Sequence, residues 1–455
     1  MVEYGSLVVT GDGRGEPPAP PTDPRVLQAV RDFDLEGRTL FLPHMPYGGS
    51  YLLAAAIRSI GFDCWPTTHS DARSMQLGGT VTSGEECYPQ KITVGDFLRM
   101  IDDLGRDKVA FLMPEANGPC RFGQYRHLIR RTLDDLGYTD VPVITITSND
   151  GYSSIGQYSR ALIRTAWRAV LANDALMKML LRTRPYELER GATDRVYLDA
   201  LRDVGRALAL REVSDRERLR ATVTALTAAR DRFRAVPARY DRSRPLIGVV
   251  GEIFCRLNQF ANADVVRMVE EQGGECWLAG IGEWVWYTDD EHRRRLIDEG
   301  RGRSREAFVR VLKAAVMHRD QNALLGPFAD DFAGYEEEHS VRAVLDRAWE
   351  YLPYDGALGE MVISTGTSIY LQGKGVDGII DISPFTCMNG IVTEAIYPAV
   401  SRDLDGLPIR TFYFDGTQSD MERDIGIFLE LARTYQRRKK PVRQFPACFG
   451  EDAAV

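Results

Sequence analysis

The chain has 455 residues, which is more than one hydrophobic core usually serves, so we expect two or three domains. Hydrophobic residues make up 44% and charged residues 27% of the sequence, as is typical of soluble globular proteins. The 57 Lys and Arg against 65 Asp and Glu leave a net charge of −8, which argues against non-specific binding to nucleic acid.

Residues 1–36 are expected to form an N-terminal arm. The segment GDGRGEPPAPPTDP suggests a phosphate-binding loop, but prolines follow where such a loop needs a helix N-terminus, so no nucleotide site is assigned. No segment approaches the roughly 18 consecutive apolar residues of a membrane span. The first residues also lack a basic region followed by an apolar run. We therefore expect a cytoplasmic protein that does not associate with membranes.

Residues 37–155 alternate between strand and helix patterns. RTLFLPHM, DKVAFLMP and VPVITITS are short apolar runs typical of buried strands, and SYLLAAAIRSIG and RFGQYRHLIRRTLDDLG have helical spacing. Strands that alternate with helices predict a parallel sheet, which binds ligands at the carboxyl ends of its strands. We interpret this region as a first α/β domain.

Residues 156–240 have helical spacing throughout and are expected to form a helical connector. A second α/β domain is predicted over 241–455, from the strand patterns RPLIGVVGEIF, GVDGIIDISPF and IRTFYFDG, with a helical insertion at about 290–351. The predicted fold class is therefore α/β, with two parallel-sheet domains, a helical connector and an insertion.

Three cysteines share one local setting, because Cys87, Cys120 and Cys387 each lie in a loop that leads to the start of a predicted helix. Unpaired amides and the helix dipole at such a position favour a thiolate, and they favour an anionic iron–sulfur cluster in the same way. The spacing is unlike that of zinc ribbons and ferredoxins, whose ligands come in CxxC pairs. The alternative is that all three are core thiols, since cysteine is among the most buried residues.

The other four cysteines are expected to have different roles. Cys64 and Cys276 lie near the starts of predicted strands, which suggests packing. Cys255 is a candidate fourth ligand or a core thiol, and Cys448 follows the basic RRKKP run in an expected mobile tail. In a cytoplasmic protein these cysteines would mostly be thiols rather than disulfides.

Four segments carry a resemblance to a known family, namely TSGEECYPQKITVGDFL, LMPEANGPCRFGQY, GEIFCRLNQFAN and DGIIDISPFTCMNGIVTEAI. They resemble motifs of the 2-hydroxyacyl-CoA dehydratase component family, which also includes benzoyl-CoA reductase subunits, double-cubane cluster proteins and activase-related proteins. NGPCRFGQY places the resemblance closest to the activase-related branch. The resemblance extends from about Gly37 to Ala432.

The resemblance implies two Rossmann-like domains and an iron–sulfur cluster held by three cysteines of each subunit, which here are Cys87, Cys120 and Cys387. The cluster would be [4Fe–4S], or half of a larger cluster shared across a homo- or heterodimer. Electrons would come from an ATP-hydrolysing iron–sulfur activator protein. Because the chain has no GxxxxGKS/T loop, it would be the electron acceptor, acting on a CoA thioester or another small substrate.

Side chains beside the cysteines are candidates to contact a bound cluster or the cysteines that hold it. Glu86 could orient a cluster or simply stabilise a helix start, and Arg121 and Gln124 could contact a cluster or an anionic substrate or lie on a surface helix turn. No HExxH pair or GxSxG elbow is present, and no catalytic acid or base is assigned. The expected function is that of an iron–sulfur enzyme of the dehydratase or reductase type. The alternative is a non-catalytic, cluster-binding accessory or activase-related subunit.

Overall fold

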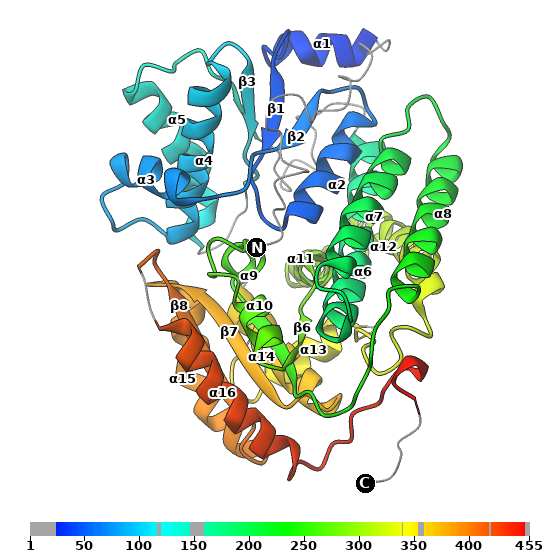
Figure 1. Cartoon of the computed structure of the whole chain (residues 1–455). Coiled ribbons are helices and arrows are strands. Elements are labelled where there is room, and N and C mark those ends of the chain that lie inside the picture. The colour runs from blue at the N-terminus through cyan, green and yellow to red at the C-terminus, as the bar shows by residue number, and fades with distance from the viewer. Residues whose placement is uncertain are drawn as a thin grey trace. The chain divides into compact units, whose positions relative to one another are not determined.

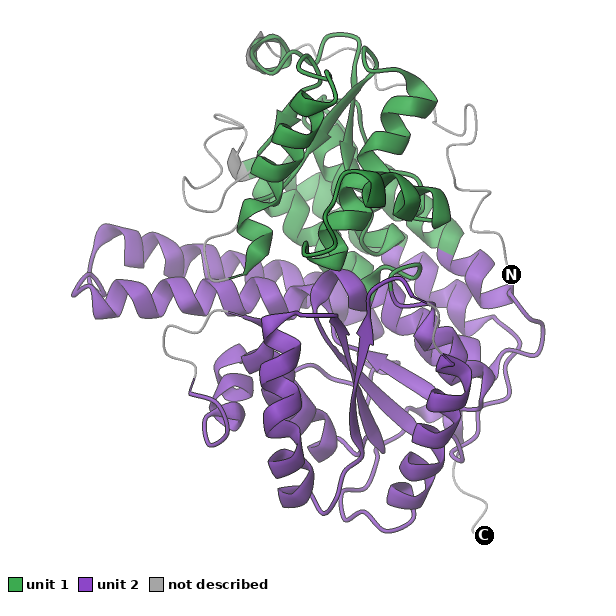
Figure 2. Cartoon of the chain, turned by 90° about the vertical axis from the view of Figure 1, so that its left-hand side faces the viewer, with its two compact units in different colours: residues 1–173, 198–225, 257–261 green, residues 174–197, 226–256, 262–455 purple. Residues whose placement is uncertain are grey.

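The computed structural model describes residues 24–115, 120–145, 159–338, 340–353, 359–417 and 420–450. Two compact units divide the chain (Figure 2). Unit 1 comprises residues 1–173, 198–225 and 257–261, and unit 2 comprises residues 174–197, 226–256 and 262–455. The expected helical connector is thus shared between the units rather than forming a body of its own.

Most of the expected N-terminal arm lies outside the described residues, but its last part is helical. Helix α1 spans Pro24–Asp32, where the sequence predicted no regular structure. Proline is favoured in the first turn of a helix because its missing N–H is not needed there. The proline that ends the Gly- and Pro-rich segment therefore also begins a helix.

Unit 1 contains a four-stranded parallel sheet in the order β2-β1-β3-β4. Figure 1 labels β1, β2 and β3 of this sheet. The strands are β1 (Thr39–Leu42), β2 (Cys64–Pro66), β3 (Val109–Leu112) and β4 (Val143–Ile144). Strands β1, β3 and β4 fall on the predicted apolar runs, and β2 begins at Cys64, which was expected near the start of a strand. Residues 146–148 of the VPVITITS segment lie outside the described residues. Four helices accompany the sheet, namely α2 (Tyr47–Arg58), α3 (Ala72–Thr80), α4 (Tyr88–Leu104) and α5 (Tyr125–Asp135).

Helices α3 and α4 approach each other closely through two glycines. A Cβ atom on Gly78 would lie 1.9 Å from the Lys91 carbonyl oxygen, and one on Gly95 would lie 1.8 Å from the Ser74 carbonyl oxygen. On its other side α4 packs on the sheet, where the rings of Phe97 and Phe111 stack with centroids 4.0 Å apart. Helix α4 is therefore held between the sheet and α3.

The segment expected to be a helical connector is helical. It forms α6 (Ser159–Thr183), a 3-10 turn η4 (Arg184–Tyr186), α7 (Ala192–Leu208) and α8 (Asp215–Arg234). Arg168 in α6 is fully buried and pairs with Asp215 at the start of α8, with 2.9 Å between Nη1 and Oδ1. At least one arginine of this region is therefore part of the packed interior of unit 1.

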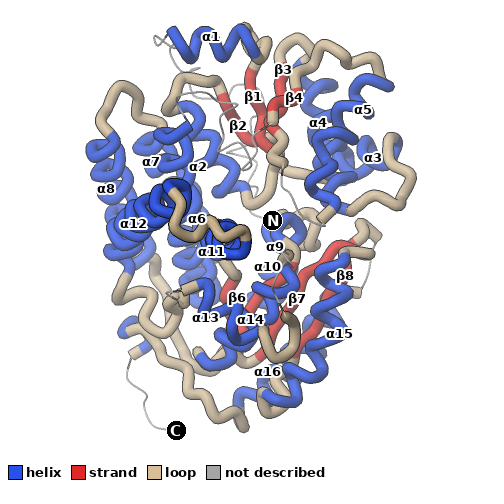
Figure 3. The backbone as a smooth tube through the Cα atoms, turned by 180° about the vertical axis from the view of Figure 1, so that it is seen from behind, coloured by secondary structure: helices blue, strands red, loops and turns tan. Residues whose placement is uncertain are grey.

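Unit 2 contains the second parallel sheet, in the order β6-β5-β7-β8. Figure 3 labels β6, β7 and β8 of this sheet. Its strands are β5 (Leu246–Gly251), β6 (Glu275–Leu278), β7 (Gly378–Pro384) and β8 (Ile409–Phe414). Every residue of β5 and β7 is buried, as expected for parallel strands covered on both faces. The predicted fold class, with two parallel-sheet α/β regions, is confirmed.

Helices cover both faces of the second sheet. Gly378 faces Phe428 of α16 (Met421–Gln436), while the neighbouring Gly248 and Ile379 face Leu371 of α14 (Glu360–Gly373). Since side chains alternate across a strand, α14 and α16 lie on opposite faces. Helix α15 (Met388–Asp403) packs beside α14, and α10 (Val265–Glu271) packs beside α16. The short helix α9 (Ile253–Leu257) follows β5 directly.

The insertion predicted at about 290–351 belongs to a helical segment between β6 and β7 that begins earlier, at Ile281. It contains α11 (Ile281–Asp298), α12 (Arg305–Leu325), the turn η5 (Gly326–Phe328) and α13 (Val341–Ala348) before α14. Among the helices that the structure describes, none has both the length and the apolar character needed to span a membrane.

The C-terminal segment is packed, which corrects the expectation of a mobile tail as far as residue 450. The Arg443 Nη2 atom donates a 2.6 Å hydrogen bond to the buried Glu275 and also bonds the Tyr335 hydroxyl. Phe449, in the 3-10 turn η6 (Ala447–Phe449), is buried against Tyr186 and Tyr240. The basic RRKKP run is compatible with this packing, because Arg443, which follows the run, bonds the buried carboxylate of Glu275.

Candidate functional site

Cys87 is the residue immediately before α4, as the sequence predicted. Its carbonyl accepts the N–H groups of Gln90 and Lys91 at 2.9 and 3.2 Å, and Pro89 in the first turn favours the start of a helix here. The side chain is 8% exposed and belongs to the hydrophobic cluster that includes Phe97 and Phe111. Cys87 therefore combines a helix-start position with the packing of a core thiol.

Cys120 is also a helix-start residue, but an exposed one. It precedes the 3-10 turn η2 (Arg121–Gln124), which continues directly into α5. Arg121 Nη1 donates a 2.9 Å hydrogen bond to the Glu85 carbonyl oxygen. This bond ties the loop before α4 to the first residue of η2, so unit 1 brings together the two segments that carry Cys87 and Cys120.

The three residues predicted to lie beside a cluster have distinct settings. The Glu86 carboxylate accepts the backbone N–H groups of Ser83 and Gly84 at 2.8 and 3.1 Å, so it closes a turn ahead of α4. Burial acts to raise the pKa of Glu86, but hydrogen bonds to its carboxylate outweigh burial and lower it. Gln124 is exposed and makes no side-chain capping bond at the start of α5. Of the three, Arg121 is the one that joins the two cysteine loops.

Cys387 follows β7 and immediately precedes α15. Thr386 before it has a positive φ of 63°, a strained conformation for a β-branched residue. A Cβ atom on Gly390 would lie 2.0 Å from the Ser383 Oγ atom, so glycine is required where α15 meets the end of β7. Strain and close packing together fix the position of the Cys387 thiol.

The electrostatics of Cys387 differ from the expectation. Burial raises the pKa of the Cys387 thiol and the nearby Glu252 carboxylate adds to the rise, while the N–H groups of Gly390 and Asn389 oppose it. The amides predicted to favour a thiolate are present, but burial and a neighbouring negative charge outweigh them. The prediction of a stabilised thiolate is therefore wrong for Cys387 in the absence of a bound cation.

Cys387 directly follows the parallel strand β7 and precedes α15. Cys87 precedes α4 and Cys120 precedes η2, and both helical segments lead to the next strand of the parallel sheet in unit 1. Cys87 and Cys120 belong to unit 1, and Cys387 belongs to unit 2. Within the described part of the chain, no three His, Cys, Asp or Glu side chains are grouped so that they could hold a metal ion.

The remaining cysteines are mostly in packed positions. Cys64 and Cys276 are buried in β2 and β6, as predicted for packing residues. Cys255 is fully buried in α9, where its thiol and its N–H both bond Glu252. Cys448 is exposed and lies 3.7 Å from Arg182 Nη1. All seven cysteines are thiols in the structure.

Unit 2 contains a polar cluster that the sequence analysis did not identify. Strands β5 and β7 are neighbours whose chains leave toward opposite edges of the sheet, and ligands bind at such a switch point in open α/β sheets. Glu252 follows β5, Arg256 lies one turn later in α9, and Glu360 begins α14. The signal was present in GEIFCR, where an acid and an arginine four residues apart follow a buried strand directly.

The carboxyl groups of this cluster are buried and already bonded. Glu252 accepts the N–H groups of Phe254 and Cys255 at 3.0 and 2.8 Å, and Glu360 accepts a 2.9 Å bond from the Asn389 side chain. Glu283, in the first turn of α11, accepts a bond from the Thr367 hydroxyl. Each carboxyl is therefore held in place by a neighbouring element.

Burial raises the pKa values of the acids in this cluster and lowers the pKa of its arginine. Burial raises the pKa of Glu283 and that of Glu360 to about 7, and it raises the pKa of Glu252. Burial also lowers the pKa of Arg256, although Glu283, Glu360, Glu252 and Asp174 oppose this. Such opposed shifts are typical of functional sites and also occur in structural ion networks.

Unit 1 has its own polar cluster after β1 and β2. The rings of His44 and His69 lie with centroids 4.5 Å apart, and Asn258 donates 3.0 Å bonds to the His44 carbonyl and to Ser70 Oγ. Ser70 in turn donates a 2.8 Å bond to Asp96. Burial lowers the pKa of His44, which favours its neutral form, and raises the pKa of Asp96 to about 7.

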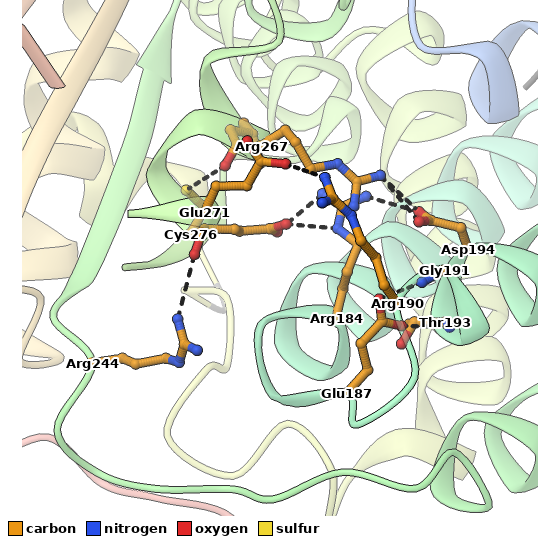
Figure 4. Close-up of polar contacts among 12 residues, drawn as sticks. Arg184, Glu187, Arg190, Gly191, Thr193, Asp194, Arg244, Arg267, Glu271 and Cys276 are labelled. Atoms are coloured by element: carbon orange, nitrogen blue, oxygen red, sulfur yellow. Dashed lines mark hydrogen bonds and ion pairs between the residues drawn. The ribbon is translucent and has the colours of Figure 1, made fainter. Parts of the chain in front are cut away.

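A third polar cluster, also in unit 2, is structural (Figure 4). Arg184 bonds both Glu270 and Asp194, and Arg267 bonds both carboxylate oxygens of Asp194 at 3.1 and 3.0 Å. The Glu187 carboxylate accepts N–H groups at the start of α7. These contacts attach η4 and α7 to α10.

Comparison with known proteins gives no assignment. No protein-family model matches the chain, and no curated protein matches it.

Proposed function

We propose that the protein is an iron–sulfur protein that resembles the electron-accepting component of 2-hydroxyacyl-CoA dehydratases. The observation that supports this most strongly is that Cys87, Cys120 and Cys387 each directly precede a helix beside a parallel sheet. In such positions backbone amides can donate to a thiolate or to a cluster sulfur. The sequence resemblance selects the same three cysteines.

The donor chemistry of these residues fits a cluster. Thiolates are the usual ligands of iron–sulfur clusters, and the Cys387 sulfur already accepts backbone N–H groups from Asn389 and Gly390. The raised pKa of Cys387 does not oppose ligation, because a coordinated thiol is deprotonated by the charge of the metal. Cys87, Cys120 and Cys387 would hold a [4Fe–4S] cluster, or half of a larger cluster shared between two subunits.

When bound, the cluster would supply low-potential one-electron transfer to a CoA thioester or another small substrate. The chain's own residues would have supporting roles. Arg121 would hold the loops of Cys87 and Cys120 together through the Glu85 carbonyl. The strained Thr386 and the close approach at Gly390 would fix Cys387. In this proposal a separate ATP-hydrolysing activator reduces the protein in the cytoplasm, and the working form is a homo- or heterodimer.

The test is iron and acid-labile sulfide content, with an ultraviolet–visible spectrum, of protein purified without oxygen. Wild type is compared with Cys87→Ala, Cys120→Ala and Cys387→Ala. Cys448→Ala is the control, because that thiol is exposed like Cys120 but is not a proposed ligand. About four irons per chain are expected in wild type and in the control.

Each proposed-ligand variant should lose the cluster while its circular dichroism spectrum stays that of wild type. Cys120→Ala is the most informative variant because removing an exposed side chain leaves the core intact. If wild type holds neither iron nor sulfide after reconstitution, the proposal is wrong. If a cluster binds but turnover needs a second, catalytic subunit, the accessory-subunit alternative replaces the enzyme.

A further inference from the structure

Gln90, in the first turn of α4, has a buried side-chain amide that no other group of the chain satisfies. The residue is 2% exposed, and neither Nε2 nor Oε1 has a hydrogen-bond partner in the part of the chain that the structure describes. Among the buried side-chain amides of the described residues, it is the only one that lacks a partner at both ends. An unsatisfied buried polar group costs about 1–3 kcal/mol, so an amide kept in this state suggests that its partner is a ligand.

The helical position of Gln90 is otherwise a core position. Val94 and Phe97 lie four and seven residues later on the same face of α4, and both belong to the hydrophobic cluster that packs against the sheet. This face of the helix is apolar until it reaches Gln90. Methionine or leucine would fill such a position without the cost of an unpaired amide, so packing alone does not explain a glutamine here.

Gln90 lies beyond the carboxyl end of β3. Phe97 stacks on Phe111, and β3 ends one residue later, at Leu112. Because α4 returns the chain to the start of β3, it runs antiparallel to that strand. The seven residues from Phe97 back to Gln90 carry the helix about 10 Å past Phe111, whereas one strand residue spans only about 3.3 Å. Gln90 is therefore placed where parallel α/β sheets bind their ligands.

Gln90 also shares its helical turn with Cys87. The Gln90 N–H donates a 2.9 Å hydrogen bond to the Cys87 carbonyl oxygen, and residues three apart are neighbours on a helix surface. A glutamine at this position of a helix has the length to reach back to the residue that precedes the first turn, which here is Cys87. The amide is therefore within reach of a group that the Cys87 thiolate binds.

We infer that Gln90 Nε2 donates a hydrogen bond to a sulfur atom of the cluster that Cys87 would help to hold, and so raises the reduction potential of that cluster. This inference rests on the proposed function. Cluster sulfur atoms accept hydrogen bonds, so they satisfy the N–H groups of the amide, and such bonds tune the potential. Reduction makes the cluster more negative, which strengthens a bond from a donor and favours the reduced form.

The test is a potentiometric titration, followed by electron paramagnetic resonance, of wild type and Gln90→Met purified without oxygen. Methionine has a similar length and no amide. At a fixed potential near the midpoint, the ratio of reduced to oxidised cluster should fall about tenfold in Gln90→Met, which corresponds to a midpoint potential about 59 mV lower. The iron and sulfide content should stay that of wild type. Gln76→Met is the control and should keep the wild-type potential, because Gln76 is an exposed glutamine of α3 in the same unit.

Hydrogen exchange of α4 in metal-free protein separates this role from a structural one. Since the amide has no partner in the described part of the chain, Gln90→Met should leave that exchange unchanged or slower, and faster exchange would overturn the inference. Gln90→Asn provides a second test if Gln90→Met does not fold or does not hold a cluster. It keeps an amide but shortens the side chain by about 1.5 Å, which breaks the hydrogen bond and should also lower the potential.

The inference and the proposed function fail in different ways. A wild-type potential in Gln90→Met, or in Gln90→Asn where that variant is needed, would overturn the inference and leave the proposed cluster standing. The amide would then bond a buried water or another protein group. A wild-type chain that holds neither iron nor sulfide after reconstitution would refute the proposed cluster, and this inference with it.

Discussion

Two ion pairs in unit 2 differ mainly in burial and can therefore be compared directly. Arg184 and Glu270 pair with side chains that are 4% and 5% exposed, whereas Arg190 and Glu271 pair with side chains that are 76% and 52% exposed. The two acids are adjacent in α10, and both arginines lie in or just after η4 (Figure 4). We predict that Arg184→Met destabilises this region strongly and that Arg190→Met does not.

The magnitude follows from the bonds that each arginine makes. Arg184 donates to the two Glu270 oxygens at 2.7 and 3.0 Å and to Asp194 at 3.1 Å. In Arg184→Met, Asp194 keeps Arg267, but Glu270 becomes a buried carboxylate without its bidentate partner. Breaking a buried pair from one side costs about 3–5 kcal/mol. An exposed pair such as Arg190–Glu271 contributes about 0.2–1 kcal/mol.

The assay is amide hydrogen exchange followed by mass spectrometry on peptides that cover α10 and α7. Local exchange is preferable to global denaturation because two compact units need not unfold together. A loss of 3–5 kcal/mol corresponds to exchange that is roughly a hundred- to several-thousand-fold faster, since each 1.4 kcal/mol is about tenfold. Arg190→Met should change exchange by less than about 5-fold.

A double variant separates the lost pair from the stranded charge. Arg184→Met/Glu270→Met should be more stable than Arg184→Met, because it removes the carboxylate left without a partner. If Arg184→Met exchanged no faster than Arg190→Met, burial would not determine the importance of this pair. If Arg184→Met/Glu270→Met were less stable than both Arg184→Met and Glu270→Met, the loss of stability would come from lost packing instead.

Two further predictions concern close packing and pH. In α14, Gly366→Ala should destabilise the protein by about 1–3 kcal/mol, because the new Cβ atom would lie 2.1 Å from the Val344 carbonyl oxygen. Gly373→Ala in the same helix should be neutral or stabilise the protein by up to about 1 kcal/mol, because its new Cβ atom would have no atom within 4 Å. Hydrogen exchange of α13 and α14 in the two variants checks this, and equal effects would contradict it. Burial raises the pKa of Asp96 to about 7, so the folded state retains a proton that the unfolded chain loses near pH 4. The stability of α4 should therefore fall by up to about 1.4 kcal/mol per pH unit as the pH rises from about 4 to about 7. Asp96→Asn should abolish this part of the pH dependence. An unchanged pH dependence in the variant would show that Asp96 is not its cause.

The sequence predicted the elements whose formation depends on local patterns. Apolar runs alternating with helical spacing correctly indicated two parallel sheets, because strands buried on both faces must be apolar throughout. The helix-start positions of Cys87, Cys120 and Cys387 were also predicted correctly, since a loop followed by helical spacing is a short-range signal. Helix α1 was missed because its first residue ends a Gly- and Pro-rich run.

The sequence by itself therefore determined where strands, helices and helix-start cysteines lie, because hydrophobic periodicity and turn residues act over a few neighbouring positions. Only the tertiary structure decided which polar groups are buried together. Glu252 and Arg256 share the β5–α9 segment, but Glu283 comes from α11 and Glu360 from α14, and no local pattern indicates that these two acids act on Arg256 as well. Burial also reversed the predicted preference of Cys387 for the thiolate, since desolvation and the Glu252 charge come from residues distant in sequence. Charge and pKa depend on the whole surroundings of a group, and those surroundings are assembled only when the chain folds.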